Sequence, residues 1–232
     1  AFKIASADIT NIPLLRQVGA SDKPVILSTG AAKLWEIDNA LTELSKVGSC
    51  SVALLHCMLN YPTAYADAGL KMIESLKRNF PDNVIGYSDH TLPEPDMMTV
   101  VAATTLGASI IEKHFTHDKT LLGNDHYHAM DFDDLKVLLK NLDRLQLVLG
   151  DVDEAGRGKE LAAREHARRS VVLNKTLPGG HVICESDITY KRPASGVSTL
   201  FWDKVIGATL LRDLEADTIL QWEDIRTLRS AV

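Results

Sequence analysis

Five short apolar runs in the first 150 residues each end in polar residues and lead into a loop and an amphipathic helical pattern. This alternation predicts parallel strands, because parallel neighbours need a connection long enough to hold a helix. The predicted strands are residues 2–6, 25–29, 52–56, 84–88 and 109–115. Apolar residues at helical spacing predict helices at residues 34–47, 66–80 and 131–149. The chain therefore opens with an α/β domain that ends at Gly150.

The composition changes after this domain. Residues 151–169 are strongly charged, which is typical of a solvated linker helix. Turn signals such as Pro178-Gly179-Gly180 then separate short strand candidates, which predict a compact, mainly β module. These candidates are residues 170–173, 181–183 and 188–191. The resulting domain assignment is a partial barrel at 1–150, a charged linker at 151–162 and a β-rich domain at 163–232.

Polar side chains gather where the predicted strands end. In a β/α barrel or an open parallel sheet, ligands bind at that edge of the sheet. The strand-end residues are Ser6, Asp8, Ser28, Thr29, Gly30, His56, Cys57, Ser88, Asp89, His90, Glu112 and His114. We expect the ligand site of this domain among them.

Two histidines, His90 and His114, end successive strands, so we expect them side by side within reach of one divalent ion. Imidazole nitrogens suit Mn, Fe, Co or Zn, and Asp89 or Asp125 could orient a ligand. The alternative is that each histidine has only a structural or hydrogen-bonding role.

Lys3 lies in the first strand, where a cation is costly to bury unless it is paired or binds an anion. Alternation places Lys3 on one face of the strand and Phe2, Ile4 and Ser6 on the other. In a barrel the face that carries Lys3 can turn toward the ligand; the alternative is that Lys3 is a surface lysine. By the same rule, Glu112 and His114 share a face and can both point to the interior.

Two loops carry further candidates. Residues 122–130 hold Asp125, His126 and His128, a density of polar groups that indicates binding of substrate hydroxyls, or else a solvated loop with incidental histidines. Tyr61, in a Tyr-Pro-Thr sequence after the third strand, could offer a hydroxyl to the site or could form a turn.

Composition excludes several classes of function. A net charge of −6 and a pI of about 5.7 argue against a polyanion-binding surface, so we expect no nucleic-acid partner. No apolar run approaches the roughly 18 residues that cross a bilayer, and residues 1–8 lack the layout of a secretory signal. The three cysteines form no CxxC pair and no disulfide framework. We therefore expect reduced thiols, no membrane partner and a cytoplasmic location.

Six segments together resemble the sialic acid synthase family, which includes N-acetylneuraminate, legionaminate and pseudaminate synthases. They run in family order over almost the whole chain. The segments are KIASADITNIPLL (3–15), KPVILSTG (23–30), LLHC…YPT (54–63), IGYSDHT (85–91), IIEKHFTHDKTLLGNDH (110–126) and KRPASG (191–196).

The resemblance implies a fold and a reaction. The fold is a partial TIM (β/α) barrel, strands 4 to 8, followed by a small β-rich antifreeze-like (SAF, β-clip) domain. In the reaction, C3 of phosphoenolpyruvate adds to the open-chain aldehyde of an N-acyl hexosamine such as N-acetylmannosamine. Water attacks C2, the C–O bond breaks, and the products are a nine-carbon 3-deoxy-2-keto acid and phosphate.

It also implies roles for individual residues. His90 and His114 correspond to the metal ligands, with Mn as the expected ion and Mg or Co as alternatives. Further matches divide into catalytic and substrate-binding groups. The catalytic group is Lys3, Glu112 and Tyr61; the substrate-binding group is Ser6, Ser28, Ser88, Asp125 and Arg192. Of these, Lys3 and the three serines match positions around phosphoenolpyruvate, whereas Tyr61 and Asp125 match positions around the sugar.

Family members are typically domain-swapped dimers in which the antifreeze-like domain caps the partner's barrel. The resemblance therefore implies that Arg192 reaches the sugar substrate of a second copy, where a guanidinium can bind acyl or hydroxyl oxygens with more than one donor.

The sequence departs from the family in two places. Met58-Leu59-Asn60 stands where many members have a Thr/Ser/Asn-rich stretch, and the family's first three strands, with a glutamate and a lysine of the active site, have no counterpart. We therefore expect the 232-residue chain alone to self-associate and to be inactive. A non-catalytic half-barrel, completed by another chain, is the alternative function; a generic metal-dependent aldolase fits less well, because it needs no Lys-Arg-Pro cap.

Overall fold

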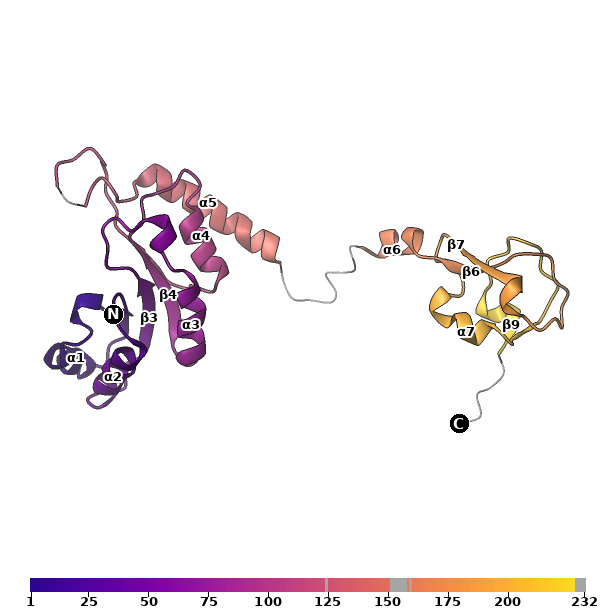
Figure 1. The fold of residues 1–232 in the computed structure, drawn as a ribbon, viewed down its shortest axis with the longest axis horizontal. Helices are drawn as coiled ribbons and strands as arrows, with labels where there is room; N and C mark the ends of the chain where they lie inside the picture. Colours follow the sequence, from indigo (N-terminus) through magenta and orange to yellow (C-terminus); the bar gives the residue numbers. More distant parts are fainter. Residues whose placement is uncertain (124, 151–157, 159, 228–232) are drawn as a thin grey trace. The chain divides into compact units, whose positions relative to one another are not determined.

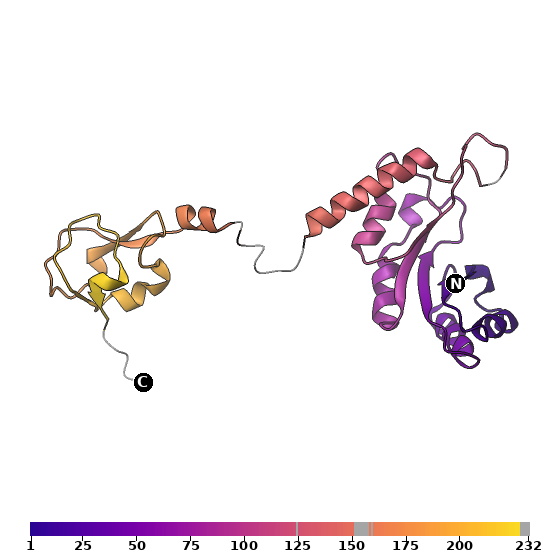
Figure 2. The same cartoon turned by 180° about the vertical axis from the view of Figure 1, so that it is seen from behind.

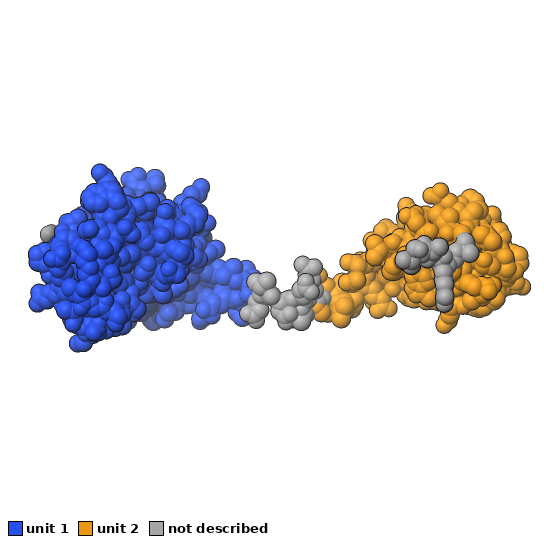
Figure 3. Space-filling model, turned by 90° about the horizontal axis from the view of Figure 1, so that it is seen from below, with its two compact units in different colours: residues 1–150 blue, residues 151–232 orange. Residues whose placement is uncertain are grey.

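The structure is a computed structural model that describes residues 1–123, 125–150, 158 and 160–227. The chain divides into two compact units, residues 1–150 and residues 151–232, which Figure 3 shows in separate colours. Within the described residues, no helix has both the length and the apolar character needed to cross a bilayer.

Unit 1 contains a single five-stranded parallel sheet, so the predicted α/β class and its strand order are confirmed. The strands pair in chain order and each is followed by a helix (Figure 1). The strands are β1 (Phe2–Ile4), β2 (Val25–Ser28), β3 (Val52–Cys57), β4 (Val84–Asp89) and β5 (Ile111–Lys113). The helices are α1 (Ile12–Gly19), α2 (Leu34–Ser45), α3 (Lys71–Asn79), α4 (Met98–Thr105) and α5 (Phe132–Leu149).

The boundaries differ from the sequence prediction at several ends. The predicted strand 109–115 is shortened to three residues, and the predicted helix 66–80 begins only at Lys71, after a separate 3-10 turn at Tyr65–Asp67. Helices α1 and α4 were not predicted. Helix α5 begins after Asp131 because that side chain accepts hydrogen bonds from the amides of Asp133 and Asp134, and it ends at Gly150, whose φ is 59°.

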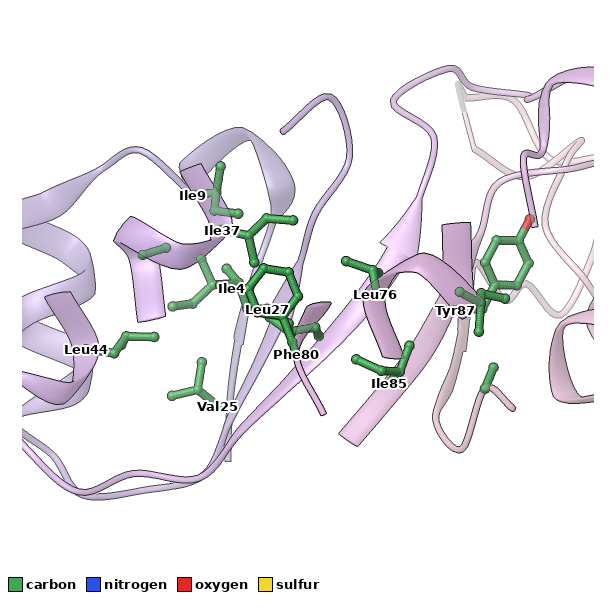
Figure 4. Packing of buried hydrophobic residues seen from close by; sticks show 14 of the residues in the cluster. Ile4, Ile9, Val25, Leu27, Ile37, Leu44, Leu76, Phe80, Ile85 and Tyr87 are labelled. Atoms are coloured by element: carbon green, nitrogen blue, oxygen red, sulfur yellow. The ribbon is translucent and has the colours of Figure 1, made fainter. Parts of the chain in front are cut away.

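The apolar core of unit 1 lies between one face of the sheet and helices α1 to α3. Parallel register places Ile4, Leu27 and Leu54 in one row across three strands, and all three are buried. Figure 4 shows Ile4 and Leu27 beside Ile37 of α2. Burial of apolar surface stabilises the fold by about 25 cal/mol per Å2. A shift of one residue in the strand pairing would move this apolar row to the other face, so the buried row fixes the register.

The other face of the sheet is curved. Lys3 of β1 and Glu112 of β5 belong to the two edge strands, yet Lys3 Nζ lies 3.4 Å from Glu112 Oε2. Side chains on opposite edges can meet only if the sheet bends so that this face is concave, as strands of a β/α barrel do. The figures show the same sheet from both sides (Figures 1 and 2).

Unit 2 is a small module of two antiparallel pairs. Strand β6 (Ser170–Leu173) pairs with β7 (Ile188–Lys191), and β8 (Thr209–Leu210) pairs with β9 (Ile225–Arg226). The unit also contains the short helices α6 (Leu161–Ala167) and α7 (Trp202–Val205). Its core is separate from that of unit 1 and includes Val171, Leu173, Ile183, Val205 and Leu220.

Two predictions for this region need correction or restriction. The predicted strand at residues 181–183 is wrong: Val182 makes only an isolated bridge with Thr209. The extended segment is short because Gly180, with φ of 83°, turns the chain just before it and a 3-10 turn (Glu185–Asp187) follows just after. Of the predicted charged helix 151–169, residues 151–157 and 159 lie outside the described residues, and α6 covers only Leu161–Ala167.

Unit 2 also contains an internal repeat. Residues 170–188 and 207–225 align without gaps, and each copy ends in a 3-10 turn, a buried aspartate and an isoleucine that begins a strand. In the first copy Lys175 pairs with Asp187, and in the second Arg212 pairs with Asp224 at the equivalent positions. The repeat explains why two pairs of strands share one core.

Candidate functional site

The concave face of the sheet carries the predicted catalytic pair Lys3 and Glu112. Parallel register places Ser88 of β4 directly opposite Glu112 of β5, and Ser88 Oγ donates a hydrogen bond to Glu112 Oε1 at 2.8 Å. Glu112 thus receives Ser88 on one oxygen and Lys3 on the other. The predicted inward orientation of Lys3 and Glu112 is confirmed, because the Lys3 ammonium group meets the Glu112 carboxylate on this face.

His90 follows β4 and is fixed by the loop after β3. Its Nδ1 lies 2.6 Å from the carbonyl oxygen of Met58, and its own carbonyl accepts a hydrogen bond from the Thr63 amide at 2.8 Å. Because a carbonyl only accepts, the hydrogen sits on Nδ1 and leaves Nε2 free. Burial lowers the pKa of His90, which favours the neutral ring, the form that binds metals.

Tyr61 lies over this histidine. The ring centroids of Tyr61 and His90 are 4.1 Å apart, and that of His114 lies 5.7 Å from Tyr61. Burial, followed by the charges of Cys57, Glu112 and Asp125, raises the pKa of Tyr61. Its hydroxyl therefore stays protonated at neutral pH and can donate a hydrogen bond into the site.

The loop between β5 and α5 returns to the strand that it left. The Met130 amide donates to the His114 carbonyl at 2.9 Å, and the Thr116 amide donates to the Met130 carbonyl at 2.9 Å. This closure brings His128 beside His114, with ring centroids 5.1 Å apart. Ligand atoms of His114, Asp125 and His128 all lie within 4.8 Å of one another, a donor set that suits a divalent metal.

His128 was not among the predicted metal ligands; the sequence indicated only a polar loop. Its side chain is 1% exposed, and neither ring nitrogen has a hydrogen-bond partner among the described residues. Burial lowers the pKa of His128, and nearby His114 lowers it further. The ring of the predicted ligand His90 lies 5.6 Å from that of His114, so three imidazoles gather at one edge of the sheet.

Two of the three serines predicted around phosphoenolpyruvate, Ser6 and Ser28, lie at the ends of the first two strands. Ser28 is 3% exposed and its hydroxyl has no partner within the described part of the chain. Ser6 is buried in the 3-10 turn (Ser6–Asp8) that follows β1, so strand alternation did not decide its direction. Gly30 follows β2. A Cβ added there would lie 2.7 Å from Cys57 Sγ and 3.0 Å from Ser6 Oγ, so position 30 requires glycine.

Asp89, considered from sequence as a residue that orients a metal ligand, is used on the other face of the sheet. It forms an ion pair with Lys113 at 2.6 Å, and both side chains are 1% exposed. The Tyr87 hydroxyl and the Thr91 amide also donate to Asp89. This network holds the chain on both sides of His90.

Arg192 belongs to unit 2 and is exposed. It follows β7, whose last residue, Lys191, forms an ion pair with Asp217. Arg192 therefore lies at the surface of its own unit.

Known proteins with related sequences cover nearly the whole chain. An uncharacterized protein of Methanocaldococcus jannaschii is 38% identical over 97% of this chain and 66% of its own length. An N,N'-diacetyllegionaminic acid synthase of Campylobacter jejuni is 36% identical over 95% of this chain and 65% of its own. The chain thus spans about two thirds of the length of these relatives.

A solved structure agrees with them. The N-acetylneuraminic acid (sialic acid) synthetase of Leptospira borgpetersenii is 37% identical, with a TM-score of 0.62 over 70% of this chain and 56% of that one. The NeuB family model matches residues 1–154, and the SAF domain model matches residues 168–226, which confirms the predicted antifreeze-like module. The half-barrel with its polar strand ends and the β module after it therefore make this chain a member of the NeuB family, the sialic acid synthase-like enzymes, with a C-terminal SAF domain.

Proposed function

We propose that this chain provides the metal site, much of the substrate site and the cap of an enzyme that condenses phosphoenolpyruvate with an N-acyl hexosamine. The observation that carries the proposal is the convergence of Lys3, Ser88 and Glu112 with three imidazoles on one concave face. Phosphoenolpyruvate carries a phosphate and a carboxylate, which a lysine and hydroxyl groups can bind. The sugar aldehyde must be polarised, which a metal ion held by the imidazoles can do.

In this proposal His90 and His114 hold the divalent ion, most simply Mn, with Mg and Co as alternatives. The bound ion would supply Lewis-acid polarisation of the sugar aldehyde. His90 is prepared for this by the Met58 carbonyl, which keeps Nε2 free for the ion.

Phosphoenolpyruvate would lie toward β1, β2 and β4. Lys3 supplies a positive charge for its phosphate or carboxylate, and Ser6 and Ser28 supply hydroxyl donors; the hydroxyl of Ser28 is without a partner among the described residues. The Ser88 hydroxyl, which donates to Glu112 in this structure, would turn to donate to the ligand. Glu112 has a catalytic role in positioning, because it holds both Lys3 and Ser88. Tyr61 donates its hydroxyl to the sugar, and Asp125 accepts from a sugar hydroxyl.

C3 of phosphoenolpyruvate forms the new bond to the aldehyde carbon, whose oxygen takes a proton. Water adds to C2, and the C2–O bond breaks, so that phosphate leaves with the bridging oxygen. The product is a nine-carbon 3-deoxy-2-keto acid. We also propose a domain-swapped homodimer, in which Arg192 of one copy reaches the sugar in the other, and a cytoplasmic location, which suits the three unpaired thiols.

The direct test supplies phosphoenolpyruvate and N-acetylmannosamine with Mn to the 232-residue chain and to the same chain extended by a family N-terminal segment carrying three strands. We expect product only from the extended protein. With oxygen-18 in the bridging position of phosphoenolpyruvate, the label should appear in phosphate. Product without label in phosphate would contradict the bond cleavage, and no product from any acyl hexosamine would favour the non-catalytic alternative.

A second test concerns the cap. Arg192→Ala in the extended protein should raise KM for the sugar much more than KM for phosphoenolpyruvate, because the guanidinium is assigned to the sugar. Mixing this variant with a Glu112→Gln variant should restore part of the activity if each site combines residues of two copies. Lys191→Ala is the neighbouring control.

A further inference from the structure

The least explained polar group in unit 1 is the side chain of His128. It is 1% exposed, and neither Nδ1 nor Nε2 has a hydrogen-bond partner among the described residues. Buried polar groups nearly always have partners, because removing them from water without one costs free energy. Its neighbour in the same loop, His126, has such a partner in the Thr116 hydroxyl at 2.8 Å.

The ring of His128 lies close to other side chains that can bind a metal ion. Its ring centroid lies 5.1 Å from that of His114 and 6.3 Å from that of Tyr61. Asp125 carries its two carboxylate oxygens 3.8 Å from His114 Nδ1 and 3.9 Å from His128 Nε2, distances too long for hydrogen bonds. One donor atom from each of the three residues lies within 4.8 Å of the others, the separation expected around a common ion.

The two ends of the segment that carries His128 are fixed by hydrogen bonds. Hydrogen bonds between Met130 and both His114 and Thr116 tie the two ends of the loop together. The next residue, Asp131, caps helix α5 and also pairs with Lys119 at 3.1 Å. His128 is therefore held three residues before the capping residue of α5, beside His114.

We propose that His128 is a further ligand of the metal ion, bound together with His114 and beside His90. The inference rests on the proposed function only for the presence of an ion at this edge. A third imidazole, with the charge of Asp125 next to it, gives the site more nitrogen donors than a two-histidine site has. Such a donor set favours Co2+ and Zn2+ over Mn2+ and Mg2+, because imidazole suits the former better.

The experiment measures metal binding directly, without substrate. The 232-residue chain is stripped with a chelator and titrated with Co2+, followed by calorimetry and by visible absorption. His128→Ala should weaken Co2+ binding by more than about tenfold, since even the loss of groups behind a ligand costs 10- to 100-fold. His117→Ala, an exposed histidine of the same segment, should leave the affinity unchanged.

A second variant guards against a folding defect. His128→Cys places a thiolate at the same position and should give a sulfur-to-cobalt charge-transfer band in the near ultraviolet, whereas wild type and His117→Cys should not. Wild-type affinity in His128→Ala, no Co2+ binding by wild type, or no band in a folded His128→Cys protein would each overturn the assignment. None of these readouts uses turnover, so they separate this inference from the condensation reaction. Product formation together with an unchanged affinity in His128→Ala would contradict only the assignment of His128 as a ligand. A Co2+ site without product formation would contradict only the proposed reaction.

Discussion

Asp89 of unit 1 and the two buried aspartates of unit 2 are stabilised in different ways. In unit 1, Asp89 is paired with Lys113 and both side chains are 1% exposed, so the whole ion pair is removed from water. In unit 2, Asp187 and Asp224 are equally buried, but their partners Lys175 and Arg212 remain 56% and 63% exposed.

The difference lies in the backbone. Asp187 accepts a hydrogen bond from the Cys184 amide, and Asp224 accepts one from the Gln221 amide, in the same 3-10 turn of each repeat. These turns stabilise the carboxylates locally, so the cation can stay in solvent. Asp89 also accepts from the Thr91 amide, but it depends on a cation from the next strand, which couples β4 to β5 immediately behind His90. A buried charge therefore serves a local turn in unit 2 and the alignment of the candidate site in unit 1.

The sharpest test of this comparison is Lys113→Met. It leaves Asp89 buried without its cation, and breaking a buried pair in this way costs about 3–5 kcal/mol. We expect faster hydrogen exchange in residues 84–89 and a lower urea midpoint for unit 1. Both are measured by mass spectrometry of peptides from that unit. The double variant Lys113→Met/Asp89→Asn should recover part of the loss; equal stability of Lys113→Met and wild type would end the comparison.

The next effect is that of Asp187→Asn in unit 2. Burial raises the pKa of Asp187, but hydrogen bonds from the Cys184 amide, Lys175 and His181 outweigh burial and hold this pKa well below its usual range. Hydrogen bonds to a charged group contribute about 1.5–3 kcal/mol, so the variant should be less stable at pH 7 by about that amount. Trp35→Phe leaves Trp202 and Trp222 to report unfolding of unit 2 by fluorescence.

The same variant has a defined pH dependence. A carboxylate whose pKa is lower in the folded state stabilises that state above its unfolded pKa, about 3.9 for aspartate, and loses this contribution as pH falls further. The gap between wild type and Asp187→Asn should therefore be constant above about pH 5 and narrow below about pH 4. A gap that widens toward acid would reverse the sign, and Asp203→Asn, an exposed change in α7, is the control.

A smaller effect is expected from the cations of unit 2. Lys175→Met and Arg212→Met remove partners that are mostly in solvent, so each should lower the urea midpoint less than Asp187→Asn does. The shift should shrink in high salt, where exposed charges are screened. If either change cost as much as Lys113→Met, the backbone could not be the main support of these aspartates.

The smallest effect is that of Lys136→Met on helix α5. Lys136 and its partner Asp133 are 76% and 89% exposed, and such pairs add little to stability. The urea midpoint of unit 1 should not change measurably. A clear loss would show that exposure does not rank ion pairs in this protein.

Much of the fold could be read from periodicity. All five strands of unit 1 and three of its helices follow from apolar spacing, because a strand or helix that covers a core must repeat its apolar residues with its own period. Helix α4 was not predicted because the apolar residues of Met98–Thr105 are spread around the helix, so they form no one-sided apolar pattern. The strand predicted at residues 181–183 failed because two turns confine the extended segment to a single bridge.

The site was predictable only in part, for a similar reason. Residues at strand ends are adjacent whenever the strands are, so the positions of Ser88, His90, Glu112 and His114 at one edge followed from the strand order. No periodicity describes where a loop returns, and His128 is brought beside His114 by two backbone hydrogen bonds that belong to the folded loop. The repeat in unit 2 was not predicted, because its halves share few residues besides the paired Lys/Arg and Asp positions.

The sequence by itself determined the five strands of unit 1, three of its helices, the parallel order of the strands and the polar character of their ends, since these depend on residue spacing along the chain. Tertiary structure decided which of those polar groups act together. The curvature of the sheet brought Lys3 of the first strand to Glu112 of the last, and closure of the β5–α5 loop brought His128 to His114. Both contacts depend on how the chain bends in three dimensions, a quantity fixed by the packing of the whole unit and not by any local pattern.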